Sequence, residues 1–311
     1  MASILVVGSV AYDSVETPFG KVDNVLGGSA TFFSLAAGFF AQVKLVACVG
    51  DDFSRDDLKL LQSRNIDLSG LQRVEGKTFR WSGRYGYDLN EAETLDTQLN
   101  VFADFRPEIP EAHRDCDYVF LGNIDPALQR QVLSQVKSPK LIVLDTMNYW
   151  ISGSYKSLKQ TLALVNVLVI NDAETRQLAQ EANLVRAARK ILSWGPSTLV
   201  IKRGEYGVLM FQKPASDDEL SAFGVPGYPL EEVFDPTGAG DSFAGGFVGY
   251  LAGTDRQDTR AMRQAIIFGS VMASFNVEKF SLNRLKELTF TEVVLRYKEF
   301  RRLTHFDDLE D

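Results

Sequence analysis

The 311-residue sequence has few cysteines, few histidines and no long apolar run. Two cysteines, Cys48 and Cys116, are too few for a disulfide framework, and Cys48 lies in an apolar run typical of a core. Two histidines, His113 and His305, exclude a histidine-rich metal site and leave no obvious catalytic triad. No apolar run approaches the roughly 20 residues of a membrane-spanning helix. We therefore expect neither a disulfide scaffold nor a membrane-embedded chain.

Basic side chains are also fewer than acidic ones. Lys and Arg number 33 against 41 Asp and Glu, which gives a net charge of −8. This balance favours neither a nucleic-acid partner nor an anionic membrane. The opening residues "MASILVVG" lack a basic leader, so we expect no signal peptide and a cytoplasmic protein. The length and the apolar fraction of 45% fit one globular domain over 1–311.

The middle of the chain alternates short apolar runs with amphipathic segments of helical period. The apolar runs cover 118–123, 140–145, 167–172 and 198–204. Runs that are apolar throughout, separated by helices, predict parallel strands covered on both faces and thus a doubly wound, mostly parallel α/β sheet. Polar residues follow these strands, as at the ligand-binding edge of such sheets, although loops are polar in any case. They are Asn123, Asp125, Asp145, Asn171, Asp172, Lys202 and Arg203.

Two segments in the first third of the chain break this alternation. Residues 9–28 and 74–102 contain turns, aromatic side chains and alternating polarity, but no convincing helical pattern. We interpret them as strands of a small second layer. The prediction is a β-strand lid, formed by approximately 10–26 and 74–104, over the carboxyl ends of the large sheet.

The stretch "FDPTGAGDSFAGGF", 234–247, carries the strongest motif. It is no Walker A loop, because no Lys follows its glycines, and it is no dinucleotide fingerprint, because Phe243 stands at the third glycine position. What remains is a glycine-rich turn that opens a helix, with Asp241 on its first turn. Bare N–H groups at such a helix start suit a phosphate, whereas Asp241 alone could equally be a capping residue.

This stretch resembles the C-terminal signature of the ribokinase (PfkB) family of carbohydrate kinases. Its usual form is Asp-Thr-Thr-Gly-Ala-Gly-Asp, from which Pro236 departs. The resemblance implies a ribokinase-like fold and an ATP-dependent kinase. The N–H groups of Gly238, Ala239 and Gly240 would receive the transferring γ-phosphoryl group. Asp241 would orient the acceptor hydroxyl and take its proton, and the helix terminus should keep this carboxylate ionised.

Other segments extend the resemblance over nearly the whole chain. "GSVAYDS" resembles the first strand and turn of the family, where Asp13 would bind sugar hydroxyls. "GGSATFFSLAAGFF" resembles its N-terminal signature, where Gly27 and Gly28 would let the backbone approach the substrate. "VINDAE" matches a motif that would arrange Mg²⁺ and water around Asn171 and Glu174, although the same spacing is a helix capping box.

The nucleotide side of the site is also implied by the resemblance. "IKRGEYGVLMF" resembles a nucleotide-binding hairpin with Gly204 and Gly207, although the family usually has Thr or Ser where Lys202 stands. Lys202 or Arg203 could instead reach a phosphate. The residues assigned to nucleotide binding are Asn171, Lys202, Gly204, Gly207, Asp235 and Thr237.

The acceptor side departs from the sugar-phosphorylating relatives. Many of these carry Asn at the position of Phe32. Phe32 or its neighbour Phe33 could stack on a sugar or a nucleobase, or could pack the helix into the core. "FRWSGRYGYDLN", 79–90, adds aromatic residues to the lid and Arg84, which we expect in the acceptor pocket.

The sequence thus predicts a kinase that uses ATP and Mg²⁺. Its acceptor is expected to be a small sugar, ribose- or fructose-like. The alternatives are a nucleoside (adenosine-like) acceptor and a non-catalytic sugar- or nucleotide-binding regulator. Many relatives hold a monovalent cation beside the adenine, but the small residues of that turn are replaced here by "EKFS", so this cation stays open. The resemblance also suggests a homodimer through the lid.

Overall fold

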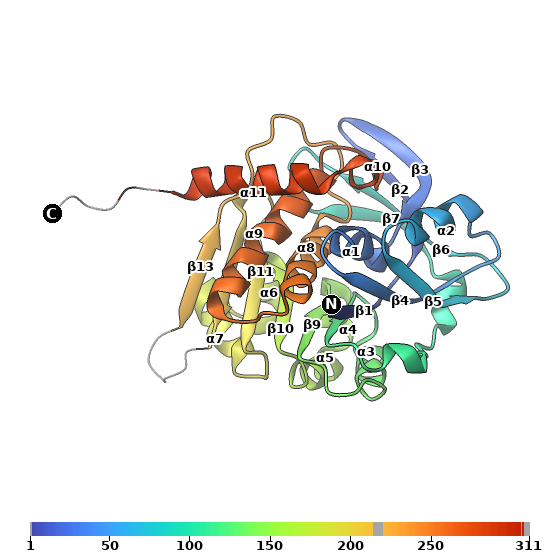
Figure 1. Cartoon of the computed structure of the whole chain (residues 1–311), viewed down its shortest axis with the longest axis horizontal. Coiled ribbons are helices and arrows are strands. Elements are labelled where there is room, and N and C mark those ends of the chain that lie inside the picture. Colours follow the sequence, from blue (N-terminus) through green and yellow to red (C-terminus); the bar gives the residue numbers. More distant parts are fainter. Residues whose placement is uncertain (1, 214–219, 306, 308–311) are drawn as a thin grey trace.

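The computed structural model describes residues 2–213, 220–305 and 307. Within these residues the strands form a nine-stranded sheet and a four-stranded sheet (Figure 1). The large sheet has, in spatial order, β13 (Ser221–Val225), β12 (Val208–Gln212), β11 (Thr198–Lys202), β10 (Val167–Asn171), β9 (Leu141–Asp145), β8 (Tyr118–Leu121), β1 (Ser3–Val7), β4 (Gln42–Val49) and β5 (Ile66–Arg73). All neighbours pair in parallel except β12, which is antiparallel to β11 and β13. The predicted sheet is confirmed, and its four apolar runs are β8 to β11.

Helices cover the large sheet on both faces, because its strands present apolar side chains in both directions. In β1, Ile4 and Val6 point into one core, whereas Leu5 and Val7 point into the other. Cys48 is buried in the second core, as predicted. The helices are α1 (Ser29–Ala37), α2 (Arg55–Gln62), α3 (Pro126–Leu133), α4 (Asn148–Gly153), α5 (Tyr155–Leu162), α6 (Asp172–Ala179), α7 (Leu184–Leu192), α8 (Ala239–Thr254), α9 (Thr259–Asn276), α10 (Asn283–Glu287) and α11 (Phe290–Thr304).

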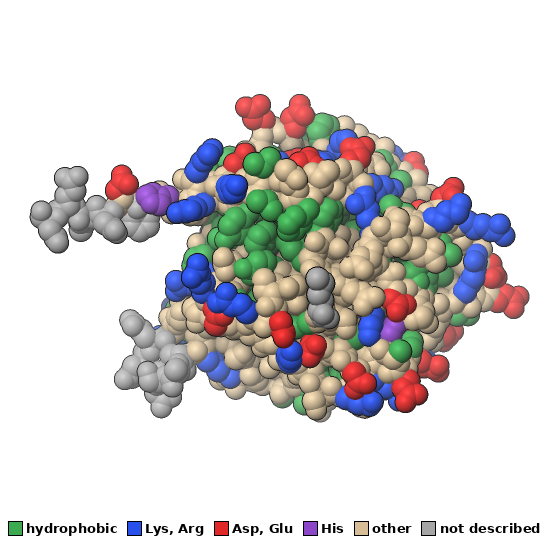
Figure 2. Space-filling view, viewed as in Figure 1, with side chains coloured by type: hydrophobic (Ala, Val, Ile, Leu, Met, Phe, Trp, Pro, Cys, Tyr) green, Lys and Arg blue, Asp and Glu red, His purple; other side chains and the backbone are tan. Residues whose placement is uncertain are grey.

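Helices α8, α9 and α11 lie on one face of the molecule, where Figure 2 shows hydrophobic side chains gathered together. Tyr250 of α8 and Tyr297 of α11 stack on Phe268 of α9, with ring centroids 4.6 and 4.4 Å away. These contacts pack α11 against α9 and α8, and the glycine-rich turn directly precedes α8. In the described ranges no helix combines the length and the apolar character that crossing a membrane requires.

The small sheet combines the two segments predicted as a second layer. Its order is β3 (Gly20–Gly27), β2 (Ala11–Thr17), β6 (Phe79–Tyr85) and β7 (Ala92–Gln98). In Figure 1 it lies beside α2 and α10, at the end of the molecule opposite β13. One boundary is corrected, because Asn100–Asp104 forms a short 3₁₀ helix, η1, rather than a strand. Phe102 of η1 stacks on Phe79, which holds this helix against the sheet. The other short 3₁₀ helices are η2 (Glu111–His113) and η3 (Gly204–Tyr206).

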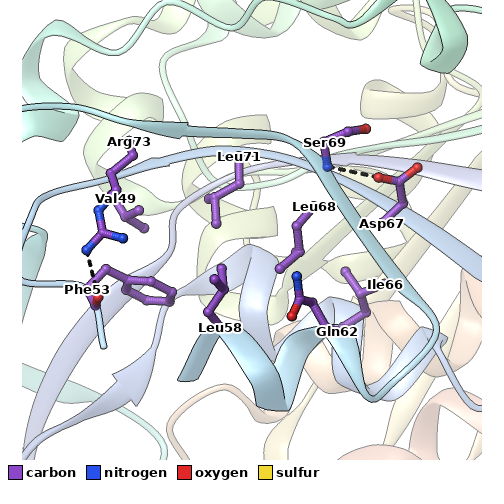
Figure 3. A pocket seen from close by; sticks show the side chains of 10 residues that line it. All are labelled: Val49, Phe53, Leu58, Gln62, Ile66, Asp67, Leu68, Ser69, Leu71 and Arg73. Atoms are coloured by element: carbon purple, nitrogen blue, oxygen red, sulfur yellow. Dashed lines mark hydrogen bonds between the residues drawn. The ribbon is translucent and has the colours of Figure 1, made fainter. Parts of the chain in front are cut away.

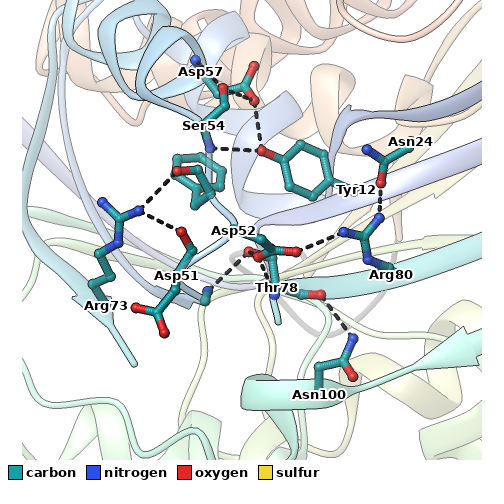
Figure 4. A network of polar contacts seen from close by, with 12 residues as sticks. Tyr12, Asn24, Asp51, Asp52, Ser54, Asp57, Arg73, Thr78, Arg80 and Asn100 are labelled. Carbon is teal, nitrogen blue, oxygen red and sulfur yellow. Dashed lines mark hydrogen bonds and ion pairs between the residues drawn. The ribbon is translucent and has the colours of Figure 1, made fainter. Parts of the chain in front are cut away.

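A polar network anchors the base of the small sheet next to α2 (Figure 4). The Asp52 carboxylate accepts hydrogen bonds from the Thr78 N–H at 2.7 Å and the Thr78 hydroxyl at 2.6 Å. Arg80 of β6 bridges Asp52, at 2.7 Å, and the Asn24 side chain on β3. The Tyr12 hydroxyl of β2 donates to Asp57 of α2 at 2.9 Å. The small sheet is therefore fixed at this end, beside the carboxyl end of β4.

Candidate active site

The glycine-rich turn opens α8, and its geometry requires glycine at Gly238. This residue has φ +74°, and a Cβ there would overlap the buried ring of Phe32. The expectation that three consecutive N–H groups face a phosphate is corrected, because the Ala239 N–H donates to the Pro236 carbonyl at 3.1 Å. Among the described residues, no protein acceptor takes the N–H of Gly238 or of Gly240. These two groups are the donors that the turn offers to an anion.

The structure places Phe32 beneath the turn and not in an open acceptor pocket. Its side chain is 2% exposed. Phe33 is also buried and stacks on Phe120, with ring centroids 4.0 Å apart. The prediction that Phe32 stacks on a substrate is therefore wrong. Its side chain packs α1 into the core and contacts Gly238.

Asp241 lies on the first turn of α8, next to charged side chains from other elements. Burial raises its pKa to about 7; Asp145 and Asp13 add to this rise, and Lys202 opposes it. We expected the helix terminus to keep the carboxylate ionised. Desolvation and like charge outweigh that dipole here, so Asp241 titrates near neutral pH. A carboxylate in this range is a better proton acceptor than an ordinary aspartate.

Lys202 supplies the positive charge of this cluster. Its ammonium nitrogen lies 3.9 Å from Asp145 Oδ1 and would be 2.6 Å from a Cβ at Gly240. Burial lowers the pKa of Lys202, but the carboxylates of Asp145, Glu174 and Asp241 outweigh it, so the pKa stands above its ordinary value. A cation is therefore held directly beside the glycine-rich turn.

The structure shows that the "VINDAE" segment forms a helix capping box, and its role toward Mg²⁺ stays a prediction. Asn171 Oδ1 accepts the Glu174 N–H at 2.7 Å, and Glu174 Oε2 accepts the Asn171 N–H at 3.0 Å, which completes a capping box at the start of α6. Burial also raises the pKa of Glu174 to about 7, with Lys202 opposing it. Asn171 uses its side-chain oxygen on the cap, whereas Glu174 also faces the charge cluster.

Residues for a magnesium ion are present, although they do not form a cage. In the ranges that the structure describes, no three His, Cys, Asp or Glu side chains converge as a metal site would need. Mg²⁺ bound with a nucleotide usually takes one or two carboxylates, several waters and the phosphates. The Glu174 and Asp145 carboxylates, which are buried at the same strand edge, fit that pattern.

The predicted hairpin lies between β11 and β12, which pair in antiparallel register. Gly204 has φ +54° and Gly207 has φ +83°, so both glycines are required by the backbone. A Cβ at Gly204 would also overlap the side chain of Asn90, from the loop between β6 and β7. The small sheet therefore reaches across to this hairpin.

Asp13 lies against the two glycines at the end of β3, Gly27 and Gly28. The Asp13 carboxylate accepts the Gly28 N–H at 3.3 Å, and a Cβ at Gly27 would overlap that carboxylate. Gly28 has φ +90° and precedes α1. Burial raises the pKa of Asp13 to about 7; the Gly28 N–H opposes this rise and the charge of Asp235 adds to it. The structure brings these residues together as the resemblance implies.

Arg84 lies on the other face of the small sheet. It pairs in register with Glu16 of β2 and forms an ion pair with it at 3.0 Å. Successive side chains of a strand alternate between faces, so Glu16 and Arg84 point away from Asp13. The expectation that Arg84 lines the acceptor pocket is therefore corrected. Trp81, in register with Asp13, and Tyr85 occupy the Asp13 face instead.

Asp235 and Thr237 form hydrogen bonds that hold the glycine-rich turn in place. The buried Asp235 carboxylate accepts the Thr237 N–H at 2.9 Å and the Ser281 N–H at 2.8 Å. The Thr237 hydroxyl donates to the Tyr85 hydroxyl at 3.3 Å. The prediction that Asp235 contacts the nucleotide is thus corrected, because both its carboxylate oxygens accept hydrogen bonds from backbone N–H groups. Burial raises the pKa of Tyr85 to about 12, so its hydroxyl stays protonated.

A cavity of about 550 Å³ lies between α2 and β5, away from the glycine-rich turn (Figure 3). Asp67 and Ser69 line it, and both contact the buried His113, at 3.2 and 2.9 Å. Both contacts are to Nε2, so this histidine cannot relay a proton from Ser69 through its second nitrogen to Asp67, as a triad requires. The three side chains therefore do not form a catalytic triad.

Sequence reasoning missed the role of three residues at the site. Asp145 ends β9, and its carboxylate meets Lys202 of β11 across β10. Tyr85 belongs to the aromatic stretch 79–90 of the predicted lid. Asn276 gave one signal, a polar amide at the end of the largely apolar run "AIIFGSVMASFN".

Several characterised kinases are similar to this chain in sequence or in fold. Cytidine kinase of Thermococcus kodakarensis is 30% identical over 259 residues, which cover 81% of this chain and 90% of that protein. A nucleoside kinase of Burkholderia thailandensis, solved with inosine, has a TM-score of 0.75 at 18% identity, covering 95% of this chain and 98% of that one. For ribokinase of Thermotoga maritima the TM-score is 0.74 at 20% identity, with 96% and 100% covered.

These structures show that the fold is ribokinase-like. The sequence itself matches the pfkB family carbohydrate kinases over residues 1–287. The chain therefore belongs to the pfkB family, whose members are kinases of carbohydrates and nucleosides.

Proposed function

We propose that this kinase transfers the γ-phosphoryl group of ATP to a hydroxyl of a nucleoside. The observation that carries the choice of acceptor is the position of Trp81. Its indole lies on the same face of the small sheet as Asp13, folded over Gly83, where a Cβ would overlap it. Stacking of a base on an aromatic side chain contributes about 1–3 kcal/mol. Similarity to a cytidine kinase supports the same choice.

The acceptor would bind between the small sheet and the glycine-rich turn. Asp13 would accept hydrogen bonds from the ribose hydroxyls, and the lack of side chains at Gly27 and Gly28 lets the substrate approach the backbone. Asp241 would hold the hydroxyl that attacks. In the transfer, a bond forms between this oxygen and the γ-phosphorus, the bond to the bridging oxygen of ADP breaks, and the proton passes to Asp241.

The phosphate side would be held by the turn and by Lys202. The N–H groups of Gly238 and Gly240 would donate to the transferring group, and the Lys202 ammonium would offset its charge. Mg²⁺, when bound with ATP, supplies further charge neutralisation, and Glu174 would hold it, through water, beside Asn171. The hairpin of Gly204 and Gly207 would support the nucleotide.

A small free sugar is the second candidate. It is favoured by the Asp13, Gly27 and Gly28 unit, which recognises hydroxyls and needs no base. The two acceptors are separated by Trp81→Ala. For a nucleoside acceptor, the change should lower kcat/KM for the nucleoside about 10- to 100-fold and change that for free ribose less than about 3-fold. Tyr87→Ala, in the loop that follows β6 and with a side chain 88% exposed, is the control.

Two results would decide against the nucleoside. Equal kcat/KM values for nucleoside in Trp81→Ala and Tyr87→Ala would remove the stacking argument. Turnover of ribose but not of any nucleoside would select the sugar. A non-catalytic regulator would bind ATP or sugar but release no ADP with either acceptor.

We also propose that two copies of the chain pair through the small sheet. Strand β7 is exposed along its whole length and forms one edge of that sheet. Unpaired edge strands readily pair with a second chain. Light scattering would show a dimer that is lost in Thr94→Pro; a monomer in the parent protein would contradict this assignment.

A further inference from the structure

Asn276 is a buried amide at the end of α9 that the catalytic assignment does not use. Its side chain is 0% exposed. A buried side-chain amide costs free energy unless both its donor and its acceptor find partners. Here both partners lie on the same short stretch of chain. The amide nitrogen donates to the Thr237 carbonyl at 2.8 Å, and the amide oxygen accepts the Ser242 hydroxyl at 3.0 Å.

These two contacts flank the glycine-rich turn. Thr237 precedes Gly238, and Ser242 follows Asp241, so Asn276 holds the residues on either side of the turn with one planar group. The orientation of the amide follows from chemistry, because the Thr237 carbonyl can only accept and must face the nitrogen.

The turn needs such support. Glycine leaves the backbone at Gly238 free to adopt several conformations, so the position of this residue relative to the first turn of α8 must be fixed from outside. Neighbouring contacts hold the approach to the turn: the Phe234 N–H donates to the Val277 carbonyl at 2.9 Å. Asn276 is the side chain that reaches both ends.

Capping of its own helix does not explain Asn276. The end of α9 is closed by backbone bonds, with the Val277 N–H directed to the Ala273 carbonyl at 3.3 Å. Both bonds of the Asn276 side chain cross instead to the residues around the start of α8.

We propose that Asn276 is a positioning residue that holds both ends of the glycine-rich turn and thereby sets the Asp241 carboxylate relative to the Gly238 and Gly240 N–H groups. The inference rests on the proposed phosphoryl transfer. Its effect should fall on kcat, because misplacing reacting groups by about 1 Å costs on the order of 100-fold, while substrates bind through other residues.

The test uses Asn276→Leu, which keeps the side-chain volume and removes both hydrogen bonds. We expect kcat to fall about 10- to 100-fold, with KM for ATP and for the acceptor unchanged within about 3-fold. Ser270→Ala is the control, because the Ser270 hydroxyl is equally buried on α9 but bonds only to Ile266 of its own helix, at 3.0 Å. Ser242→Ala should give a smaller loss, and its effect should not add to that of Asn276→Leu.

Hydrogen exchange gives a readout that does not depend on activity. Amides of residues 237–242 should exchange faster in Asn276→Leu than in Ser270→Ala, while the strands of the large sheet keep their protection. If the parent protein phosphorylates no acceptor, the proposed function fails and this exchange result alone decides the positioning role. Unchanged exchange in these amides, or a kcat within about 2-fold of the parent value, would overturn the inference.

Discussion

The ammonium group of Lys202 lies 3.9 Å from the carboxylate of Asp145, across β10 at the carboxyl edge of the large sheet. This pair places a cation beside Gly240, at the start of α8, where the other nearby side chains are acidic. The site therefore has a neutralising charge of its own next to the position proposed for the transferring phosphoryl group.

Lys202→Met should weaken binding of Mg·ATP. Removing the cation leaves the carboxylates of Asp145, Glu174 and Asp241 without their compensating charge and removes a partner of the phosphates. Loss of a charged hydrogen bond of this kind corresponds to about 10- to 100-fold in Kd. Titration calorimetry measures the change. Lys140→Met, which loses an exposed pair with Asp255, is the control. Equal Kd values for the two variants would contradict the role of Lys202.

The pH dependence of kcat/KM should show an acidic limb near neutral pH. Burial raises the pKa of Asp241 to about 7, and only the ionised form can take the proton of the acceptor. The value of kcat/KM should therefore fall about tenfold for each pH unit below about 7. A profile that stays flat down to about pH 5 would show that Asp241 is ionised throughout, or that it is not the base.

The same carboxyl group should make the ligand-free protein less stable at high pH. The pKa of Asp241 rises from 3.8 to about 7 on folding, so between these values the folded state binds more protons than the unfolded state. The free energy of unfolding must therefore decrease as pH rises through this window. Asp241→Asn should be more stable than the parent by on the order of 1 kcal/mol at about pH 8 and not at about pH 4.

Denaturant titrations at the two pH values measure this difference. Asp255→Asn is the control of opposite sign, since Lys140 holds the pKa of Asp255 below its usual range. That variant should show no gain at the higher pH. A gain for Asp241→Asn at low pH as well would assign its effect to something other than ionisation.

The glycine at 238 should tolerate no side chain. Its φ of +74° disfavours any other residue, and a Cβ would collide with the Phe32 ring. Gly238→Ala should cost about 1–3 kcal/mol of stability. It should also lower kcat, because the turn and its N–H groups must move. Gly153→Ala, where a Cβ would meet nothing within 4 Å, is the control and should be neutral. Thermal unfolding of the two variants separates them.

Much of the fold could be predicted because buried parallel strands leave a plain signal. The runs that became β8, β9, β10 and β11 are apolar throughout, and the helices between them keep their period. The carboxyl ends of these strands placed Asn171 and Lys202 correctly at one edge.

The errors concern side-chain direction and local hydrogen bonds, which depend on tertiary packing. The sequence predicts Arg84 in the acceptor pocket, but the structure turns it away. Which face of β6 meets the large sheet depends on the register of β6 with β2, and the sequence does not show that register. For Phe32 the sequence leaves substrate stacking and core packing both open, because a helix pattern does not say which turn covers this side chain. Ala239 was counted as a phosphate donor because the sequence does not show that its N–H closes onto Pro236.

The most direct test of the account is ADP release from Mg·ATP, measured with nucleosides, pentoses, hexoses and sugar phosphates as acceptors, with Asp241→Asn in parallel. The account predicts turnover with a nucleoside and a loss of about 100- to 10,000-fold in kcat for Asp241→Asn, since its general base is gone. Turnover that Asp241→Asn retains, or tight ATP binding with no turnover for any acceptor, would contradict the assignment of Asp241 as the base in a nucleoside kinase.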